Sequence, residues 1–351
     1  MKKFYYLELL RFLSALSVLL FHYQHFFKPY SSFSNINFDE NKFVQPFYSI
    51  LNIFYDHGNL GVPMFWAISG FVFAFVYLET KNIVKGKQFF INRFARLYPL
   101  HIATLFIVAI IQLISSNIFG NFQIYQFNDL YHFFLQIFFI SGWGFENGYS
   151  FNAPIWSVSI ELVIYMFFFF SIIYLNKYKL KFVIFIYLLL LVIDKLSLVG
   201  IYIFDDNLFI ECARLFYSGI LIFYIQKHFN NKIILLFISL CLVIFSFVGN
   251  FKLFLFFPSL VLFFVSAEIF IIDKIKNIFQ VLGNLTYAIY LLHIPVQICL
   301  ILLFAYFNIY NEIYTNNYFL IMYIFLMLVL SYLCFNLYEK PINKKIRSFF
   351  N

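Results

Sequence analysis

The sequence predicts an all-α polytopic membrane protein with about ten transmembrane helices, one short re-entrant or interfacial segment and both termini in the cytoplasm. Three observations predict this fold class. Hydrophobic residues make up 63% of the 351 residues and charged residues only 11%. Long apolar runs recur along the whole chain. Lys and Arg gather in alternate connections between these runs. This composition excludes a soluble globular protein.

The positions of the spans follow from length, because a helix rises about 1.5 Å per residue and about 20 mostly apolar residues cross the hydrocarbon layer. The first run follows Met-Lys-Lys and has no small-residue cleavage site, which predicts a retained helix and not a removed signal peptide. Ten runs meet the length criterion: 5–27, 60–79, 97–117, 152–174, 181–200, 207–226, 232–248, 253–272, 282–305 and 318–337.

An eleventh apolar run, 129–142, has the length of a re-entrant or interfacial segment. If it does not cross and the N-terminus is cytoplasmic, 18 of the 24 basic residues fall on the inner side. If it does cross, the basic loop at 176–181 and every later basic loop move outside, against the positive-inside rule. We therefore expect this segment to stay on the outer side.

We expect a single transmembrane domain over residues 1–351 and no appended soluble domain. The formal net charge of +8 is explained by basic cytoplasmic loops, so membrane lipids and not nucleic acid are the expected surroundings. The four cysteines lie far apart within apolar runs, without a C-x-x-C pair or a histidine at ligand spacing. We expect no metal site.

Ionisable residues inside apolar spans point to functional sites, because inserting a charged side chain at the bilayer centre costs about 2.5–3.5 kcal/mol of free energy. Arg11 and His22 are eleven residues apart on the first span, which places them on one helix face about 16 Å apart. Singly, Arg11 can extend to the inner headgroups and His22 lies near the outer end. Together they suit an elongated anionic ligand that enters from the cytoplasm and ends beside a base titrating near neutral pH.

Two further ionisable residues lie near the middle of the membrane. Glu161 is nine residues into its span, and its short side chain cannot reach the headgroups. It is either a protonated acid bonded to a neighbouring helix or a group that orients or charge-stabilises an imidazole. His293 is eleven residues into its span. A neutral imidazole that bridges two helices is its commoner explanation, and contact with substrate is the functional one.

Polar groups also lie at the cytoplasmic end and at the outer end of the predicted helix bundle. Arg93 and Arg96 stand at i, i+3 before the third span, where two guanidiniums can grip phosphates, although basic loops contain many such pairs. On the outer side, residues 143–156 mix aromatic and amide side chains as carbohydrate binding requires, and interfacial aromatic belts have the same mixture. The candidate substrate-binding residues are Trp156, Ser157 and His293.

Six segments, in this order, resemble the acyltransferase-3 family of polytopic O-acyltransferases that modify cell-surface carbohydrates. The resemblance covers nearly the whole chain. The segments are LELLRFLSALSVLLFH with the R-x10-H motif on Arg11 and His22, GNLGVPMFWAISGFVFAF from Gly58 to Phe75, RFARLYP with Arg93 and Arg96, IWSVSIE ending on Glu161, LTYAIYLLHIP with His293, and LSYLCFNLYEKP.

The resemblance implies a ten-helix core in the cell inner or plasma membrane, with acetyl-CoA or a related acyl-CoA as the cytoplasmic donor. The implied acceptor is a hydroxyl of a surface polysaccharide or glycan precursor, as in lipopolysaccharide or capsule modification, or of a lipid-linked oligosaccharide. It also implies donor-binding and catalytic roles for Arg11, His22, Arg93 and Arg96. We hypothesise that Arg93 and Arg96 hold the CoA phosphates, Arg11 lines the donor tunnel and His22 is the general base, with Glu161 supporting its imidazole.

A transporter or flippase is the alternative, in which Arg11, His22, Glu161 and His293 form a proton or substrate path. Two features disfavour it: no pair of broken helices repeats between the halves, and the intramembrane charges concentrate in the first half. A polysaccharide polymerase or ligase would be expected to carry a large outer loop rich in Arg or His between late helices. The late outer connections here are short and nearly uncharged.

Overall fold

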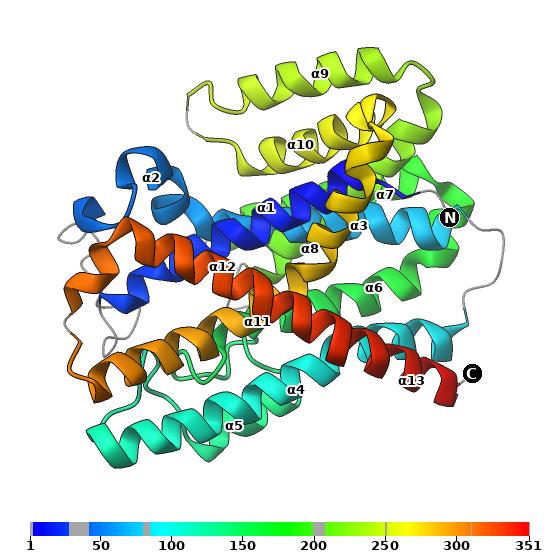
Figure 1. The fold of residues 1–351 in the computed structure, drawn as a ribbon. Coiled ribbons are helices and arrows are strands. Elements are labelled where there is room, and N and C mark those ends of the chain that lie inside the picture. The colour runs from blue at the N-terminus through cyan, green and yellow to red at the C-terminus, as the bar shows by residue number, and fades with distance from the viewer. Residues whose placement is uncertain are drawn as a thin grey trace. The chain divides into compact units, whose positions relative to one another are not determined.

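The computed structural model describes residues 3–27, 42–79, 85–198, 208–249, 251–309 and 311–350. Within these ranges all regular structure is helical, and there is no strand. The all-α prediction is confirmed for this part of the chain. Each of the ten predicted spans contains helix (Figure 1).

The α helices range in length from 8 residues in α5 to 34 residues in α4 and α11. The α helices are α1 (Tyr5–Phe21), α2 (Tyr48–His57), α3 (Gly61–Leu78), α4 (Gly86–Phe119), α5 (Leu130–Ile137), α6 (Trp156–Tyr178), α7 (Leu180–Leu198), α8 (Leu208–His228), α9 (Lys232–Phe245), α10 (Leu253–Ala267), α11 (Asp273–Tyr306), α12 (Asn317–Cys334) and α13 (Lys340–Phe350). The shorter 3₁₀ segments are η1 (His22–Phe26), η3 (Lys42–Val44), η4 (Gly58–Leu60), η5 (Ala153–Ile155), η6 (Glu268–Phe270) and η7 (Asn311–Thr315), and η8 (Phe335–Glu339) is a π-helix.

Among the described residues, 8 helical stretches are long and apolar enough to cross a bilayer by length and composition. The chain is therefore a membrane protein. The expected spans 181–200 and 232–248 correspond to α7 and α9, which are not among the eight. The 14 residues of α9 give a length of about 21 Å, shorter than the hydrocarbon layer of about 30 Å. The count of ten spans stays a prediction.

The segment 129–142 contains one short helix, α5. Asp129 begins it, because its carboxylate accepts the backbone N–H of His132 at 2.9 Å and the His132 ring Nδ1–H at 2.8 Å. The 8 residues of α5 span about 12 Å, less than half of the hydrocarbon layer. This helix cannot cross a bilayer, and its placement on the outer side stays a prediction.

The chain forms two compact units. Unit 1 comprises Met1–Ser14, Gly61–Gly86 and Ile160–Asn284, and unit 2 comprises Ala15–Leu60, Lys87–Ser159 and Leu285–Asn351. Helices α1, α6 and α11 each contribute residues to both units.

In unit 1, α3 and α8 pack closely through a glycine on each helix. A Cβ on Gly70 would lie 1.8 Å from the Phe216 carbonyl oxygen, and one on Gly219 would lie 2.1 Å from the Ala67 carbonyl oxygen. Without side chains at these positions the two backbones can touch, as at other membrane helix contacts. Helices α9 and α10 lie side by side (Figure 1). Ile233 and Phe237 on α9 are 62% and 66% exposed, as lipid contact requires.

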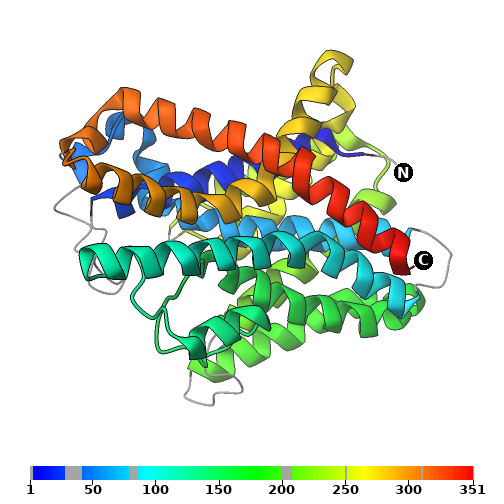
Figure 2. The ribbon, with the colours of Figure 1, turned by 60° about the horizontal axis from the view of Figure 1, so that its bottom comes forward.

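Unit 2 contains the end of α1 and the last helices of the chain. Figure 2 shows α12 continuing through η8 into α13 as one rod. Residues 28–41 of the long outer connection, expected at 28–59, lie outside the described residues. The remainder holds α2 and η4, so this connection is partly helical. Glycine 58 of η4 lies against α1, since Ser17 Oγ donates to the Gly58 carbonyl at 3.2 Å.

Candidate active site

The sequence His-Tyr-Gln-His-Phe ends the first span as the 3₁₀ helix η1. A 3₁₀ helix has three residues per turn, so residues i and i+3 stand directly above one another. His22 therefore stacks on His25, with ring centroids 5.3 Å apart and an angle of 16° between planes. Tyr23 and Phe26 form a second stripe of the same period, with centroids 5.1 Å apart.

The Tyr23–Phe26 stripe anchors η1 in the core of unit 2. Both rings are 0% exposed, and Phe26 stacks on Tyr314 at 4.9 Å. The Tyr23 hydroxyl donates to the Tyr314 carbonyl at 2.8 Å. Because the two stripes belong to one short helix, burial of the aromatic stripe fixes where the two histidines point.

His22 contacts a second segment of the chain through its ring. Its Nδ1 lies 3.1 Å from Nε2 of His293 on α11, and the two rings stack with centroids 4.8 Å apart. Gln297, one turn further along α11, donates its side-chain Nε2–H to the His22 carbonyl at 2.9 Å. Helix α11 therefore holds residue 22 at both its side chain and its backbone.

The three imidazoles differ in accessibility. His25 and His293 are 0% exposed, whereas His22 is only partly buried. The Tyr125 hydroxyl lies 3.5 Å from His25 Nε2 on the far side of the stack. His22 is therefore the least buried member of this histidine cluster (His22, His25 and His293).

The start of α6 lies beside the same part of α11. The Tyr290 hydroxyl donates to the Pro154 carbonyl at 2.7 Å and lies 2.7 Å from Ser157 Oγ. The rings of Tyr290 and His293 have centroids 6.1 Å apart. Thus Ser157 is connected to the histidine cluster through Tyr290. Trp156 is the first residue of α6 and is half-buried.

Asn152 lies near this site, in the segment 143–156 whose aromatic and amide side chains suit carbohydrate binding, and was not among the three candidate substrate-binding residues. It is 0% exposed, and its Nδ2 donates to Thr104 Oγ1 at 3.0 Å and to the Leu291 carbonyl at 2.9 Å. Its Oδ1 has no hydrogen-bond partner among the described residues. A buried amide oxygen without a partner is costly, so this acceptor is a candidate contact for a bound hydroxyl. Its place in the polar loop before α6 was the available signal.

Arg93 and Arg96 lie within α4, which begins at Gly86 and not at residue 97 as the hydropathy indicates. Both side chains project from a helix that runs several turns beyond the apolar stretch. Arg93 is partly buried and Arg96 is exposed. Two guanidiniums one turn apart on such an extension can grip a dianionic phosphate.

Two tyrosine hydroxyls stabilise α4 next to this pair. Pro99 interrupts the hydrogen bonds of α4 because it has no N–H. Tyr287 of α11 donates to the Leu97 carbonyl at 2.6 Å, and Tyr338 of η8 donates to the Pro99 carbonyl at 3.1 Å. Tyr287 and Tyr338 each lie in a segment that resembles a family motif, and both have backbone carbonyls of α4 as partners. The sequence did not indicate these two contacts.

Arg11 belongs to unit 1, where its Nη1 donates to Glu8 Oε2 at 3.1 Å. Gly283 of α11 makes room for this pair, because a Cβ there would lie 2.1 Å from the same Glu8 oxygen. Glu161 also belongs to unit 1, where it is 8% exposed. It lies one helical turn before Tyr165, which stacks on Phe73 at 4.2 Å.

The residues expected to form the site thus fall into two sets. Unit 2 brings together His22 and His293, connects Ser157 to them through Tyr290, and carries Trp156, Arg93 and Arg96. Unit 1 carries Arg11 and Glu161. Within the described residues, no three His, Cys, Asp or Glu side chains are grouped as metal ligands.

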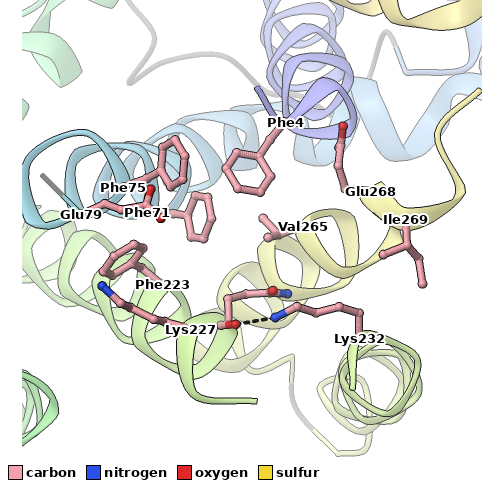
Figure 3. A pocket seen from close by; sticks show the side chains of 11 residues that line it. Phe4, Phe71, Phe75, Glu79, Phe223, Lys227, Lys232, Val265, Glu268 and Ile269 are labelled. Atoms are coloured by element: carbon pink, nitrogen blue, oxygen red, sulfur yellow. Dashed lines mark hydrogen bonds between the residues drawn. The ribbon is translucent and has the colours of Figure 1, made fainter. Parts of the chain in front are cut away.

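A separate pocket of about 270 Å³ lies in unit 1 (Figure 3). Two of its charged groups cap helix ends. The Glu268 carboxylate accepts the backbone N–H groups of Tyr5 and Tyr6 at 2.9 and 3.1 Å, and Lys232 donates to carbonyls at the end of α8. These groups have helix-end roles. The lining residues are Phe4, Phe71, Phe75, Glu79, Phe223, Gln226, Lys227, Lys232, Val265, Glu268 and Ile269.

The sequence as a whole matches a known family. The family profile described as an acyltransferase domain, of the acyltransferase-3 type, covers residues 4–336. The chain belongs to the acyltransferase-3 family. No curated protein and no solved structure matches the chain. The family assignment and the apolar helices together make the protein a membrane acyltransferase.

Proposed function

We propose that this acyltransferase moves an acyl group, expected to be acetyl, from cytoplasmic acyl-CoA to a hydroxyl of an extracytoplasmic surface polysaccharide or glycan precursor. The observation that carries the proposal is the partly buried His22, whose imidazole contacts a second imidazole inside an acyltransferase-3 domain. Acyl transfer to an alcohol needs a base for the hydroxyl proton, and imidazole is the commonest such base.

In the proposed reaction His22 removes the proton of the acceptor hydroxyl as its oxygen attacks the thioester carbonyl. An ester C–O bond forms, the C–S bond breaks, and the proton passes from His22 to the departing thiolate of CoA. The products are the acylated acceptor and CoA. No redox step or metal ion is needed to balance this transfer.

Arg93 and Arg96 are proposed to bind the phosphates of the donor, because they lie one turn apart on α4, Arg93 partly buried and Arg96 exposed. Trp156 and Ser157 are proposed for the acceptor side, with the Asn152 amide oxygen as a further acceptor of hydroxyl hydrogen bonds. The roles expected for Arg11 in the donor tunnel and for Glu161 beside the base stay predictions.

A plasma or inner-membrane location with both termini in the cytoplasm is proposed from the distribution of basic residues. A reporter that is active only in the cytoplasm, fused after α13, tests this orientation. Activity of the fused reporter supports it, and an inactive reporter in protein that is still inserted contradicts it.

CoA release by purified protein in lipid nanodiscs tests the enzymatic proposal and separates it from a transporter or flippase. Wild-type protein should release CoA from acetyl-CoA when an acceptor glycan is present. His22→Ala should lower kcat about 100-fold or more, in line with loss of a general base. The matched control is His57→Ala, which removes an exposed histidine of the same unit. Full activity of His22→Ala would refute the role of His22 as the general base.

The same assay tests donor binding. The double variant Arg93→Gln with Arg96→Gln should raise the KM for acyl-CoA more than it lowers kcat. Lys345→Gln, which removes an exposed positive charge of α13, is the control. An unchanged donor KM in the double variant would contradict this assignment.

A further inference from the structure

We infer that the pocket of unit 1 binds the headgroup of phosphatidylethanolamine, a zwitterionic phospholipid (Figure 3). The inference goes beyond acyl transfer, and its site belongs to a different unit from the histidine cluster. The distribution of basic residues predicts that this end of unit 1 faces the cytoplasmic leaflet. The volume of about 270 Å³ lies near the lower end for small-molecule sites, about 300–1,000 Å³. Such a pocket can hold a headgroup but not a whole lipid.

The pocket changes from apolar to charged along the helices that line it. Its inner wall is formed by Phe71 of α3, Phe223 of α8 and Val265 of α10, which are 1%, 4% and 4% exposed. Glu79 follows the last residue of α3 and Lys227 lies in the last turn of α8, and both residues are exposed. A phospholipid has the same gradient where its acyl chains join the headgroup. The pocket therefore suits an amphiphile of the bilayer and not a wholly polar solute.

Four charged side chains line the pocket, and two of them already have partners. The Glu268 carboxylate accepts two backbone N–H groups at the start of α1, and Lys232 donates to two carbonyls at the end of α8. Among the described residues, neither Glu79 nor Lys227 has a hydrogen-bond or ion-pair partner for its side chain. One carboxylate and one ammonium group are therefore available to a ligand.

These two groups match the two charges of a phosphoethanolamine headgroup. The ammonium of the headgroup can donate to the Glu79 carboxylate, and the phosphate oxygens can accept from the Lys227 ammonium. With two Glu and two Lys side chains the pocket has no net charge, so it balances a zwitterion and not an anionic lipid. The C-terminal ends of α3, α8 and α10 lie at the pocket. Their partial negative charge also favours a ligand that carries an ammonium group.

Four phenylalanine rings line the pocket, and they bear on the choice between an ethanolamine and a choline headgroup. Aromatic faces attract quaternary ammonium groups, so phosphatidylcholine is the alternative occupant. However, the Lys227 Nζ lies 5.6 Å from the centroid of the Phe223 ring, so one cation already lies beside the rings (Figure 3). A second cation there would be repelled. A choline group also has no N–H to donate to Glu79.

Native mass spectrometry of delipidated protein in detergent tests the site with three lipids of identical acyl chains: phosphatidylethanolamine, phosphatidylcholine and phosphatidylglycerol. Phosphatidylethanolamine should bind at least about fivefold more tightly than the other two, which is the ratio expected for one charge contact near the membrane surface. Equal affinities, or tighter binding of either of the other lipids, would overturn the inference.

Two substitutions assign the two contacts. Glu79→Gln should remove the preference for phosphatidylethanolamine over phosphatidylcholine, because the carboxylate accepts hydrogen bonds only from the primary ammonium. Lys227→Gln should weaken the binding of both lipids about fivefold and leave the ratio of their affinities unchanged, because both carry the phosphate. The matched control is Lys181→Gln, which removes an exposed lysine of the same unit outside the pocket.

Three outcomes would contradict this assignment: a lipid preference that survives in Glu79→Gln, unchanged lipid affinities in Lys227→Gln, or an effect of Lys181→Gln as large as that of Lys227→Gln. All three substituted residues are exposed, so the variants should fold, and thermal unfolding in detergent checks this. The comparison of three lipids on the wild type remains decisive if a variant unfolds. Acyl-CoA and glycan are absent from these measurements, so the result does not depend on the proposed acyl transfer.

Discussion

Substitution of Gly58 by Ala is expected to impair the site without touching a functional group. The Gly58 backbone is right-handed helical, with φ −66° and ψ −20°, so Ala can adopt it without strain. Its added Cβ would lie 2.2 Å from the Ser17 carbonyl oxygen and 2.8 Å from Cβ of Phe21, the residue before His22. Any effect therefore reports the close approach of η4 to the end of α1.

The magnitude follows from these distances. Ordinary contact begins at 3.4 Å, so the two backbones must separate by about 1.2 Å. Overpacking of this kind costs about 1–3 kcal/mol. Replacing Gly by Ala on a compatible backbone stabilises by about 0.4–1 kcal/mol through the unfolded chain, which leaves a net loss of up to about 2.6 kcal/mol. A shift of about 1 Å at a catalytic group can lower kcat about 100-fold.

Thermal unfolding in detergent and CoA release, measured on the same preparation, test this prediction. Asn59→Ala is the matched control, because the neighbouring side chain is exposed. The reasoning is refuted if Gly58→Ala is at least as stable as wild type and retains its kcat, as backbone entropy alone would predict.

Three further predictions concern stability. Gly70→Ala should destabilise by about 1–3 kcal/mol, because its Cβ would overlap the Phe216 carbonyl; a gain of about 1 kcal/mol in thermal unfolding, as helix propensity alone predicts, would contradict the packing of α3 on α8. The backbone N–H of His132 lowers the pKa of Asp129 below its ordinary value of 3.8. The ionised Asp129 carboxylate therefore stabilises α5 above pH 3.8, and this stabilisation is lost as pH falls through the folded-state pKa. Hydrogen exchange of α5 should show this loss in wild type but not in Asp129→Asn. Tyr287→Phe should cost about 1 kcal/mol through loss of its hydrogen bond to α4, and an unchanged unfolding temperature would count against that role.

Hydropathy predicted the bounds of a helix well where the whole helix is apolar. Predicted spans at 60–79 and 207–226 agree closely with α3 (Gly61–Leu78) and α8 (Leu208–His228). It placed the start of α4 eleven residues late and that of α11 nine residues late. A helix can continue past the hydrocarbon layer with charged residues. An apolar run therefore shows which part of the helix lies in the hydrocarbon layer, and not where the helix begins or ends.

The candidate site was predicted in part. The sequence singled out His22 and His293, because an imidazole inside an apolar run is rare. It did not indicate that they touch, since the contact between two helices 271 residues apart depends on packing that has no local signal. It also treated residues 5–27 as one α-helix. The change to 3₁₀ geometry at His22, which stacks His25 on it, depends on burial of Tyr23 and Phe26 among aromatic residues from the end of the chain.

Mass spectrometry of surface glycans tests the central claim, that His22 drives acyl transfer to an external hydroxyl, most directly. Cells that lack this gene should be complemented with the wild type, with His22→Ala or with His57→Ala, at matched levels of inserted protein. The account predicts an acetyl increment on the glycan with the wild type and His57→Ala, and its loss with His22→Ala. An increment that persists at the wild-type level with His22→Ala would contradict it.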